Sequence, residues 1–176
     1  MKIIFLGPQG SGKSTPAKML AEKLNVPYIE MGQLLRDKKE GTDEDAKQIR
    51  DAMETGVLVT NEITMHVLDQ RLKEQDTQNG FVLDGYPRNQ EQMASVPEDI
   101  DQVLYVKVPD EEAVERLLKR QRADDTPDVI RKRLDVYHQE TEPLLEDFSK
   151  KGILLEIDGM PTIEQIHEDI SKKLNI

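Results

Sequence analysis

The chain has 176 residues, with 24 Lys and Arg against 35 Asp and Glu, and it contains no cysteine. The length suggests a single domain, and the lack of cysteine excludes disulfides, thiolate metal sites and a thiol nucleophile. A net charge of −11 argues against a general nucleic-acid binder, which would present a positive field. No apolar run is long enough to span a bilayer, and the first residues do not have the pattern of a signal peptide. We therefore expect a cytoplasmic protein with no nucleic-acid or membrane partner.

Five short apolar runs predict buried strands. Each run is too short for a solid helix, and several are almost continuous in Ile, Val, Leu and Phe. That pattern is typical of strands covered on both faces of a parallel sheet. The runs are residues 2–6, 27–30, 81–84, 103–108 and 153–157.

Segments with helical periodicity separate these runs. They are residues 13–24, 61–75 and 111–122, a long segment from Pro127, and a final helix that begins near Thr162. Pro143 predicts a kink or break in the long segment, and Thr162 with Gln165 matches a capping box. The alternation of strand and helix predicts an α/β fold. We expect a three-layer, doubly wound sheet of five parallel strands with helices on both faces.

Residues 7–15 carry the strongest motif, Gly-Pro-Gln-Gly-Ser-Gly-Lys-Ser-Thr. This segment matches G-x-x-x-x-G-K-[ST], follows the first predicted strand and opens the first predicted helix, which is the context that the motif requires. Glycines let backbone N–H groups turn toward phosphate oxygens, and a helix N-terminus adds partial positive charge. Lys13 is expected to reach the β and γ phosphates, and a hydroxyl of Ser14 or Thr15 to face Mg²⁺.

Pro16 stands in the first turn of this predicted helix. A missing N–H group is tolerable there. However, proline biases Thr15 away from helical dihedral angles, and the N–H of Thr15 should point at phosphate. Two interpretations stay open: a harmless first-turn proline, or a loosened phosphate cradle with reduced activity.

Arginines concentrate in this acidic chain. Arg36 and Arg88 follow the second and third predicted strands, at the edge where doubly wound sheets bind ligands. A guanidinium group binds two phosphate oxygens at once. Several of them would offset the repulsion between two polyphosphates, about 4 kcal/mol for unit charges 4 Å apart at an effective dielectric of 20. Five of the nine arginines fall within residues 116–133: Arg116, Arg120, Arg122, Arg131 and Arg133.

The cluster predicts phosphoryl transfer between two phosphorylated ligands. No catalytic base is obvious in the sequence, and a phosphate acceptor needs none. Its second pKa lies near ~6, so that it is largely ionised at neutral pH. Catalysis then depends on positioning and on stabilisation of charge.

These motifs resemble the adenylate kinase family of nucleoside monophosphate kinases over nearly the whole chain. The combination of the phosphate loop with Asp84-Gly85-Tyr86-Pro87-Arg88 is highly specific. The other matching segments, in family order, are Gly32-x-Leu34-Leu35-Arg36, residues 56–59, Gln92, Arg122-Ala123-Asp124-Asp125 and Arg133. The resemblance implies one P-loop kinase domain over residues 1–176. Its core would be 1–29, 60–121 and 129–176, with a helical AMP-binding segment at 30–59 and a short lid at about 122–128.

The resemblance implies reversible, Mg²⁺-dependent transfer of the γ-phosphoryl group of ATP to AMP by a monomer, giving two ADP. The implied catalytic residues are Lys13, Arg88, Arg122 and Arg133. ATP would contact Gly10, Ser11, Gly12, Lys13, Ser14, Thr15, Arg116, Arg120 and Pro161. AMP would contact Met31, Arg36, Val57, Leu58, Val59, Gly85, Arg88, Gln92, Arg122 and Arg133, with Gln92 on adenine. Asp84 would orient waters on Mg²⁺, and Thr15 would be the second metal residue.

The chain departs from the family where Glu30-Met31-Gly32-Gln33 replaces the usual Ser-Thr-Gly-Asp. Met31 removes a threonine hydroxyl from the expected base contact, and Gln33 removes a carboxylate near the expected Mg²⁺ waters. The family also usually has glutamine in place of Pro16. Two alternatives therefore stay open. One is a kinase of the same architecture that acts on UMP or CMP, and the other is a nucleotide-binding module that has lost turnover.

Overall fold

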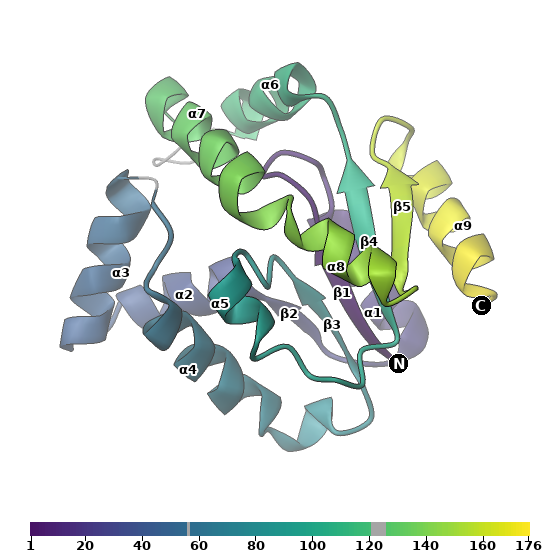
Figure 1. Cartoon of the computed structure of the whole chain (residues 1–176), viewed down its shortest axis with the longest axis horizontal. Coiled ribbons are helices and arrows are strands. Elements are labelled where there is room, and N and C mark those ends of the chain that lie inside the picture. Colours follow the sequence, from purple (N-terminus) through teal and green to yellow (C-terminus); the bar gives the residue numbers. More distant parts are fainter. Residues whose placement is uncertain (56, 121–125) are drawn as a thin grey trace.

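The computed structural model describes residues 1–55, 57–120 and 126–176. Its centre is one parallel sheet in the order β2-β3-β1-β4-β5 (Figure 1). The strands are β1 (Lys2–Leu6), β2 (Tyr28–Glu30), β3 (Phe81–Asp84), β4 (Gln102–Lys107) and β5 (Leu154–Asp158). The central β1 pairs on both sides, so that Ile4 lies opposite Leu83 and Val103. The predicted parallel sheet is confirmed, and each boundary lies within one residue of the sequence-based one.

Helices cover both faces of this sheet, which confirms the predicted three layers. Side chains of β1 alternate between the faces, as a strand requires. Ile3 and Phe5 pack in one core cluster with residues of α1 (Ser14–Leu24) and α9 (Ile163–Leu174). Ile4 and Leu6 pack in another cluster with residues of α4 (Asn61–Leu72) and α8 (Leu144–Lys150). No helix among the described residues is both long and apolar enough to cross a membrane.

Helix α1 continues through Pro16, and Thr15 is helical as well. Proline is tolerated here because the first four N–H groups of a helix have no helical partner. Ala17 still donates to the carbonyl of Lys13 at 3.0 Å. The backbone therefore agrees with the harmless interpretation of Pro16, and its effect on activity stays a prediction.

The long helical segment from Pro127 is divided into three parts. It comprises α7 (Pro127–Val136), a π-helical turn (Tyr137–Thr141) and α8. In the π turn, Glu142 donates to the carbonyl of Tyr137 at 2.9 Å. Proline lacks the N–H for a regular helical bond and its ring clashes with the carbonyl four residues back, so the chain widens before Pro143. The predicted break is confirmed. The predicted capping box of α9 is also present, because Thr162 and Gln165 exchange side-chain-to-backbone hydrogen bonds.

The segment expected to bind AMP folds into α2 (Met31–Lys39) and α3 (Glu44–Thr55). Buried Leu35 and Ile49 join these helices to the same core cluster as Ile4. The remaining helices are α5 (Gln90–Met93), α6 (Asp110–Arg120) and the 3-10 helix Gln75–Thr77. Residues 127 and 128, assigned to the lid from the sequence, belong to α7 instead, because Thr126 caps that helix by accepting from the N–H of Val129. The rest of the predicted lid up to residue 125 lies outside the described residues.

Candidate active site

A cavity of about 620 Å³ lies at the carboxyl ends of the strands. Glu30 ends β2 and Asp84 ends β3, and both line the cavity. The phosphate loop lines one side, while residues of α2, α3, α6 and α7 line the rest. This is the edge at which doubly wound sheets bind ligands.

The phosphate loop takes its shape from glycine. Gly7 has φ +146°, and a Cβ there would lie 2.5 Å from the carbonyl oxygen of Val106. Residues other than glycine rarely adopt such a φ angle, so the turn from β1 into the loop depends on Gly7. The loop then leads directly into α1, with Lys13 at the N-cap position.

Lys13 carries a poorly solvated positive charge. Its Nζ lies 3.4 Å from the carbonyl oxygen of Pro8 and 3.9 Å from Oδ1 of Asp84. Burial lowers the pKa of Lys13, and the negative charge of Asp84 acts in the opposite direction. An ammonium group that has lost water interacts strongly with a bound anion, which suits a phosphate ligand.

Asp84 is 2% exposed and is held through one of its two oxygens. Ser14 Oγ donates to Oδ2 at 2.6 Å, and the Tyr28 hydroxyl donates to the same oxygen at 2.8 Å. Oδ1 has no hydrogen-bond partner within the described parts of the chain. Thr15 lines the cavity but is exposed. The hydroxyl that contacts Asp84 is that of Ser14, and the metal role expected for Thr15 stays a prediction.

These residues suit a magnesium ion that arrives with a nucleotide. Nowhere in residues 1–55, 57–120 or 126–176 do three or more His, Cys, Asp or Glu side chains gather as a metal site. Mg²⁺ commonly keeps several waters and binds through one or two carboxylates together with substrate phosphates. Oδ1 of Asp84 is buried and has no hydrogen-bond partner among the described residues, so it is the oxygen that would hold such a hydrated ion.

Arginines from several elements converge on the cavity. Burial lowers the pKa of Arg88; Asp84 opposes this shift, whereas Arg133 and Arg36 reinforce it. Because a guanidinium group does not deprotonate in proteins, Arg88 remains a cation in a positive field. An anion bound there would relieve the repulsion. The arginines lining the cavity are Arg36, Arg50, Arg88, Arg116, Arg120 and Arg133.

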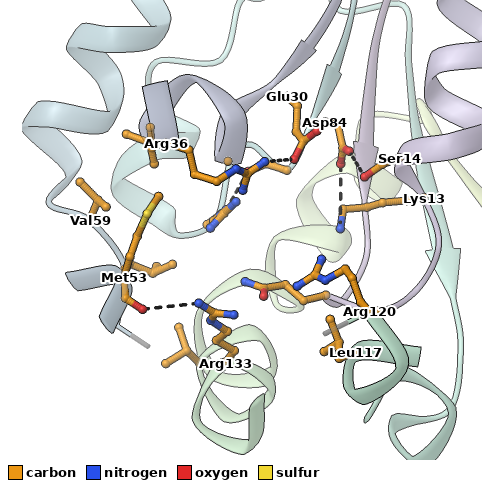
Figure 2. A pocket seen from close by; sticks show the side chains of 18 of the residues that line it. Lys13, Ser14, Glu30, Arg36, Met53, Val59, Asp84, Leu117, Arg120 and Arg133 are labelled. Carbon is orange, nitrogen blue, oxygen red and sulfur yellow. Dashed lines mark hydrogen bonds and ion pairs between the residues drawn. The ribbon is translucent and has the colours of Figure 1, made fainter. Parts of the chain in front are cut away.

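Two of these arginines are anchored on the side of the expected AMP segment (Figure 2). Arg36 Nη2 lies 2.6 Å from Oε1 of Glu30, and the same nitrogen donates to Oε1 of Gln33 at 2.9 Å. Arg133 Nη2 donates to the carbonyl oxygen of Met53 at 3.4 Å, which connects α7 with α3. The Gln33 amide therefore helps hold Arg36.

Arg116 connects two loops on the opposite side. Its Nη1 donates to the carbonyl oxygens of Ser11 at 3.2 Å and Gly159 at 3.0 Å, and its Nε donates to Glu112 at 2.5 Å. The guanidinium group thus fixes the phosphate loop against the loop that follows β5. Arg120 also lines the cavity, and its charge lowers the pKa of Lys13 in the same direction as burial.

Several predicted contact residues do not line the cavity. Gln92 is 1% exposed, accepts from the backbone N–H of Arg88 at 2.8 Å and donates to Oδ1 of Asn61 at 3.0 Å. Its amide forms hydrogen bonds inside the protein, and the expected contact with adenine stays a prediction. Met31 is fully buried in the core. It is apolar and packs in the same cluster as Leu35, which lies on the same helix.

Two further predicted residues do not line the cavity, and a third cannot be placed relative to it. Ser11 is buried and Pro161 is exposed, and neither is part of the cavity lining. Arg122 lies outside the described residues. The predicted residues that do line the cavity are Gly10, Gly12, Lys13, Ser14, Thr15, Arg36, Val57, Leu58, Val59, Asp84, Gly85, Arg88, Arg116, Arg120 and Arg133.

Several residues that line the cavity have no role implied by the sequence motifs. Glu30 is the most informative, since it ends a strand at the ligand edge, and that position alone was a usable signal. Gln9 lies within the phosphate loop, and Gly32 and Leu35 lie within the motif that ends at Arg36. The remaining residues carry no motif, and the folding of α2, α3, α6 and α7 brings them to the cavity: Lys39, Glu40, Arg50, Met53, Glu54, Leu117 and Val136.

Comparison with known proteins agrees with this geometry. A family model described as adenylate kinase matches residues 5–153. The chain is 39% identical to an adenylate kinase of Nocardia farcinica over 96% of both chains. It is 42% identical to an adenylate kinase of Mycobacteroides abscessus over 99% of both chains, and 38% identical to one of Stenotrophomonas maltophilia over 97% of both. With a phosphate loop and converging arginines around one cavity, and with these matches over nearly its full length, the chain belongs to the adenylate kinase family.

Proposed function

We propose that the chain transfers the γ-phosphoryl group of ATP to AMP reversibly, giving two ADP. The observation that carries the proposal is one cavity with two phosphate-binding sides. Lys13 and the phosphate loop form one side, and Arg36 and Arg133 lie on the other (Figure 2), where their charges act on the lining residue Arg88. A protein that only bound ATP would not need the second side.

ATP would bind with its phosphates on the loop. Backbone N–H groups at the start of α1 would face the phosphate oxygens, and Lys13 would contact the β and γ phosphates. Arg116 and Arg120 line the same side and would bind the rest of the triphosphate. Asp84 and Ser14 would hold a hydrated Mg²⁺ ion, which would supply positive charge to neutralise the phosphates of ATP.

AMP would bind between the sheet edge and the helical segment. Its phosphate would lie among Arg36, Arg88 and Arg133, and its base against the backbone of residues 57–59. An oxygen of the AMP phosphate would then attack the γ phosphorus while the bond to the β–γ bridging oxygen breaks. The electron pair leaves with ADP, and no proton has to move because the acceptor is already ionised. Lys13 and Arg88 would stabilise the charge of the transferring group.

The choice of AMP over other monophosphates rests on similarity to the relatives named adenylate kinase. Gln92 was the sequence-based reason for adenine, and its amide is occupied by Arg88 and Asn61. A kinase that acts on UMP or CMP therefore stays the second candidate. A monomeric, cytoplasmic enzyme is the accompanying prediction.

The deciding experiment is a coupled assay of ADP formed from ATP, Mg²⁺ and AMP, with CMP, UMP and GMP in parallel. Turnover that is specific to AMP is the expected result. A strong preference for CMP or UMP would replace AMP as the acceptor. Tight ATP binding without ADP formation from any acceptor would support the binding module that has lost turnover, and Pro16, Met31 and Gln33 would be the first positions to change.

A further inference from the structure

We propose that Tyr28 is a positioning residue for Asp84. Its hydroxyl, together with that of Ser14, fixes one carboxylate oxygen so that the other faces Lys13 and the bound phosphates. The inference rests on the proposed function only in naming the ligand of that second oxygen as the hydrated Mg²⁺ of a nucleotide.

The position of Tyr28 follows from the sheet and from α1. Strands β2 and β3 are parallel neighbours, with Glu30 opposite Asp84 and Tyr28 opposite Val82. The Tyr28 side chain is partly buried and packs against the core cluster on the α1 side of the sheet. Lys18 Nζ lies 5.3 Å from the centre of its ring, a contact that favours one ring position. Tyr28 is therefore held by α1, the helix that also carries Ser14.

The single hydroxyl proton of Tyr28 has two acceptors within reach. Oδ2 of Asp84 lies at 2.8 Å, and Oε2 of Glu30 lies at 3.4 Å. The shorter distance assigns the proton to Asp84. A phenol is protonated at neutral pH, so the Tyr28 hydroxyl acts as the donor to this carboxylate.

Two donors on one oxygen determine what the other oxygen does. Oδ2 accepts from Ser14 and Tyr28, while Oδ1 has no hydrogen-bond partner in the described structure and lies 3.9 Å from Lys13 Nζ. Because χ2 of aspartate is a soft torsion, the two donors on Oδ2 help to fix the orientation of the carboxylate. Without the Tyr28 hydroxyl, Oδ2 keeps only the Ser14 donor, and Oδ1 is held less firmly where it would meet a hydrated Mg²⁺ ion.

The test is Tyr28→Phe, which removes only the hydroxyl. ATP binding is measured by calorimetry with Mg²⁺ and in excess chelator. We expect the gain in affinity that Mg²⁺ gives to fall about tenfold, the scale of a hydrogen bond to a charged group, while Mg²⁺-free binding stays within about twofold. In the ADP assay, kcat falls at low Mg²⁺ and recovers partly at high Mg²⁺, and KM for AMP is unchanged.

Tyr105→Phe is the matched control, because Tyr105 is a buried tyrosine of β4 that does not line the cavity. This variant should leave unchanged the gain in ATP affinity that Mg²⁺ gives. Ser14→Ala removes the other donor, and the double variant with Tyr28→Phe should be non-additive, because both hydroxyls act on one oxygen.

Two results would overturn the inference. One is a Tyr28→Phe protein whose Mg²⁺ effect equals that of the wild type. The other is an equal loss of ATP affinity with and without Mg²⁺, accompanied by a lower Tm, which would make Tyr28 purely structural. The binding measurement needs no turnover. A wild type that binds Mg·ATP without making ADP would therefore refute the proposed function and still test Tyr28.

Discussion

The two sides of the cavity are built in different ways. The phosphate loop is one stretch of backbone, residues 7–15, shaped by glycine and continued into α1. The opposite side is assembled from side chains of distant elements, and its arginines are held by Glu30, Gln33 and the carbonyl of Met53. The first side takes its shape mainly from the main chain, with Arg116 as its side-chain support. The second side depends on several side-chain contacts, each of which a single substitution can remove. The following predictions probe the second side.

Arg88→Ala is expected to have the largest effect. Arg88 lies close enough to Arg133 and Arg36 for their positive charges to act on it. The loss of Arg88 would remove charge stabilisation from the transferring phosphoryl group. We expect kcat/KM for AMP to fall about 10³-fold, while ATP binding to the loop persists. Steady-state ADP formation and ATP titration measure the two effects. Arg131→Ala, at an exposed position of α7, is the control, and an unaltered rate in Arg88→Ala would remove Arg88 from the site.

Gln92→Leu distinguishes two roles of Gln92: a contact with the base of AMP, or hydrogen bonds that support the fold. Its amide pairs with the N–H of Arg88 and with Asn61. The leucine would remove the acceptor of the backbone N–H of Arg88, whereas Oδ1 of Asn61 would still accept from Asn89. We expect the free energy of unfolding to fall by about 1–3 kcal/mol with no change in the rate ratio between AMP and CMP. Thermal unfolding and the acceptor panel measure both. Gln90→Leu, at the exposed start of α5, is the control. A shifted AMP/CMP ratio would show that Gln92 reaches the base after all.

Glu30→Gln tests the carboxylate that pairs with Arg36. Both side chains are partly exposed and lie 2.6 Å apart, so the negative charge competes with a phosphate for the guanidinium group. We expect KM for AMP to fall about threefold, as a weak ion pair would allow, with kcat nearly constant. Glu112→Gln makes the same change beside Arg116 on the ATP side and should leave KM for AMP alone. A rise of KM in Glu30→Gln would mean that the carboxylate orients Arg36 for binding.

The smallest expected effect concerns His138, which links the two helices that carry Arg120 and Arg133. Its Nδ1 lies 2.7 Å from Glu142, and its Nε2 lies 2.9 Å from Asp110 at the start of α6. The hydrogen bond with Glu142 is the largest cause that raises the pKa of His138, and Asp110 adds to it. Protonated His138 therefore stabilises the folded protein. Because its folded pKa lies above the unfolded value of about 6.5, this stabilisation is fully present below that pH and is lost as pH rises through the folded pKa.

For this partly exposed histidine the contribution should be about 0.5 kcal/mol. The measurement is the free energy of unfolding between pH 5.5 and pH 8 for the wild type and for His138→Gln. The difference between the two proteins should shrink toward high pH. His66→Gln is the control, since His66 is exposed and pairs with Gln70 rather than with a carboxylate. A difference that grows with pH would contradict the assignment.

The sequence predicted what local pattern encodes. Continuous apolar runs predicted the strands, and the glycine and lysine spacing predicted the phosphate loop, because both depend on neighbouring residues. The contacts of Gln92 could not be predicted, since they need Asn61 and Arg88 from distant parts of the chain. The choice between Ser14 and Thr15 likewise depends on which hydroxyl α1 turns toward Asp84, and Tyr28 carries no motif at all.

Arg116 has a mechanical consequence. One guanidinium nitrogen holds the carbonyls of Ser11 and Gly159, which belong to loops at opposite ends of the sequence. Because the guanidinium group is rigid and planar, it sets the distance between the two loops whose carbonyl oxygens it contacts. Displacements of the two loops are then correlated, and a distortion introduced in the loop after β5 is transmitted to the phosphate loop without passing through the sheet.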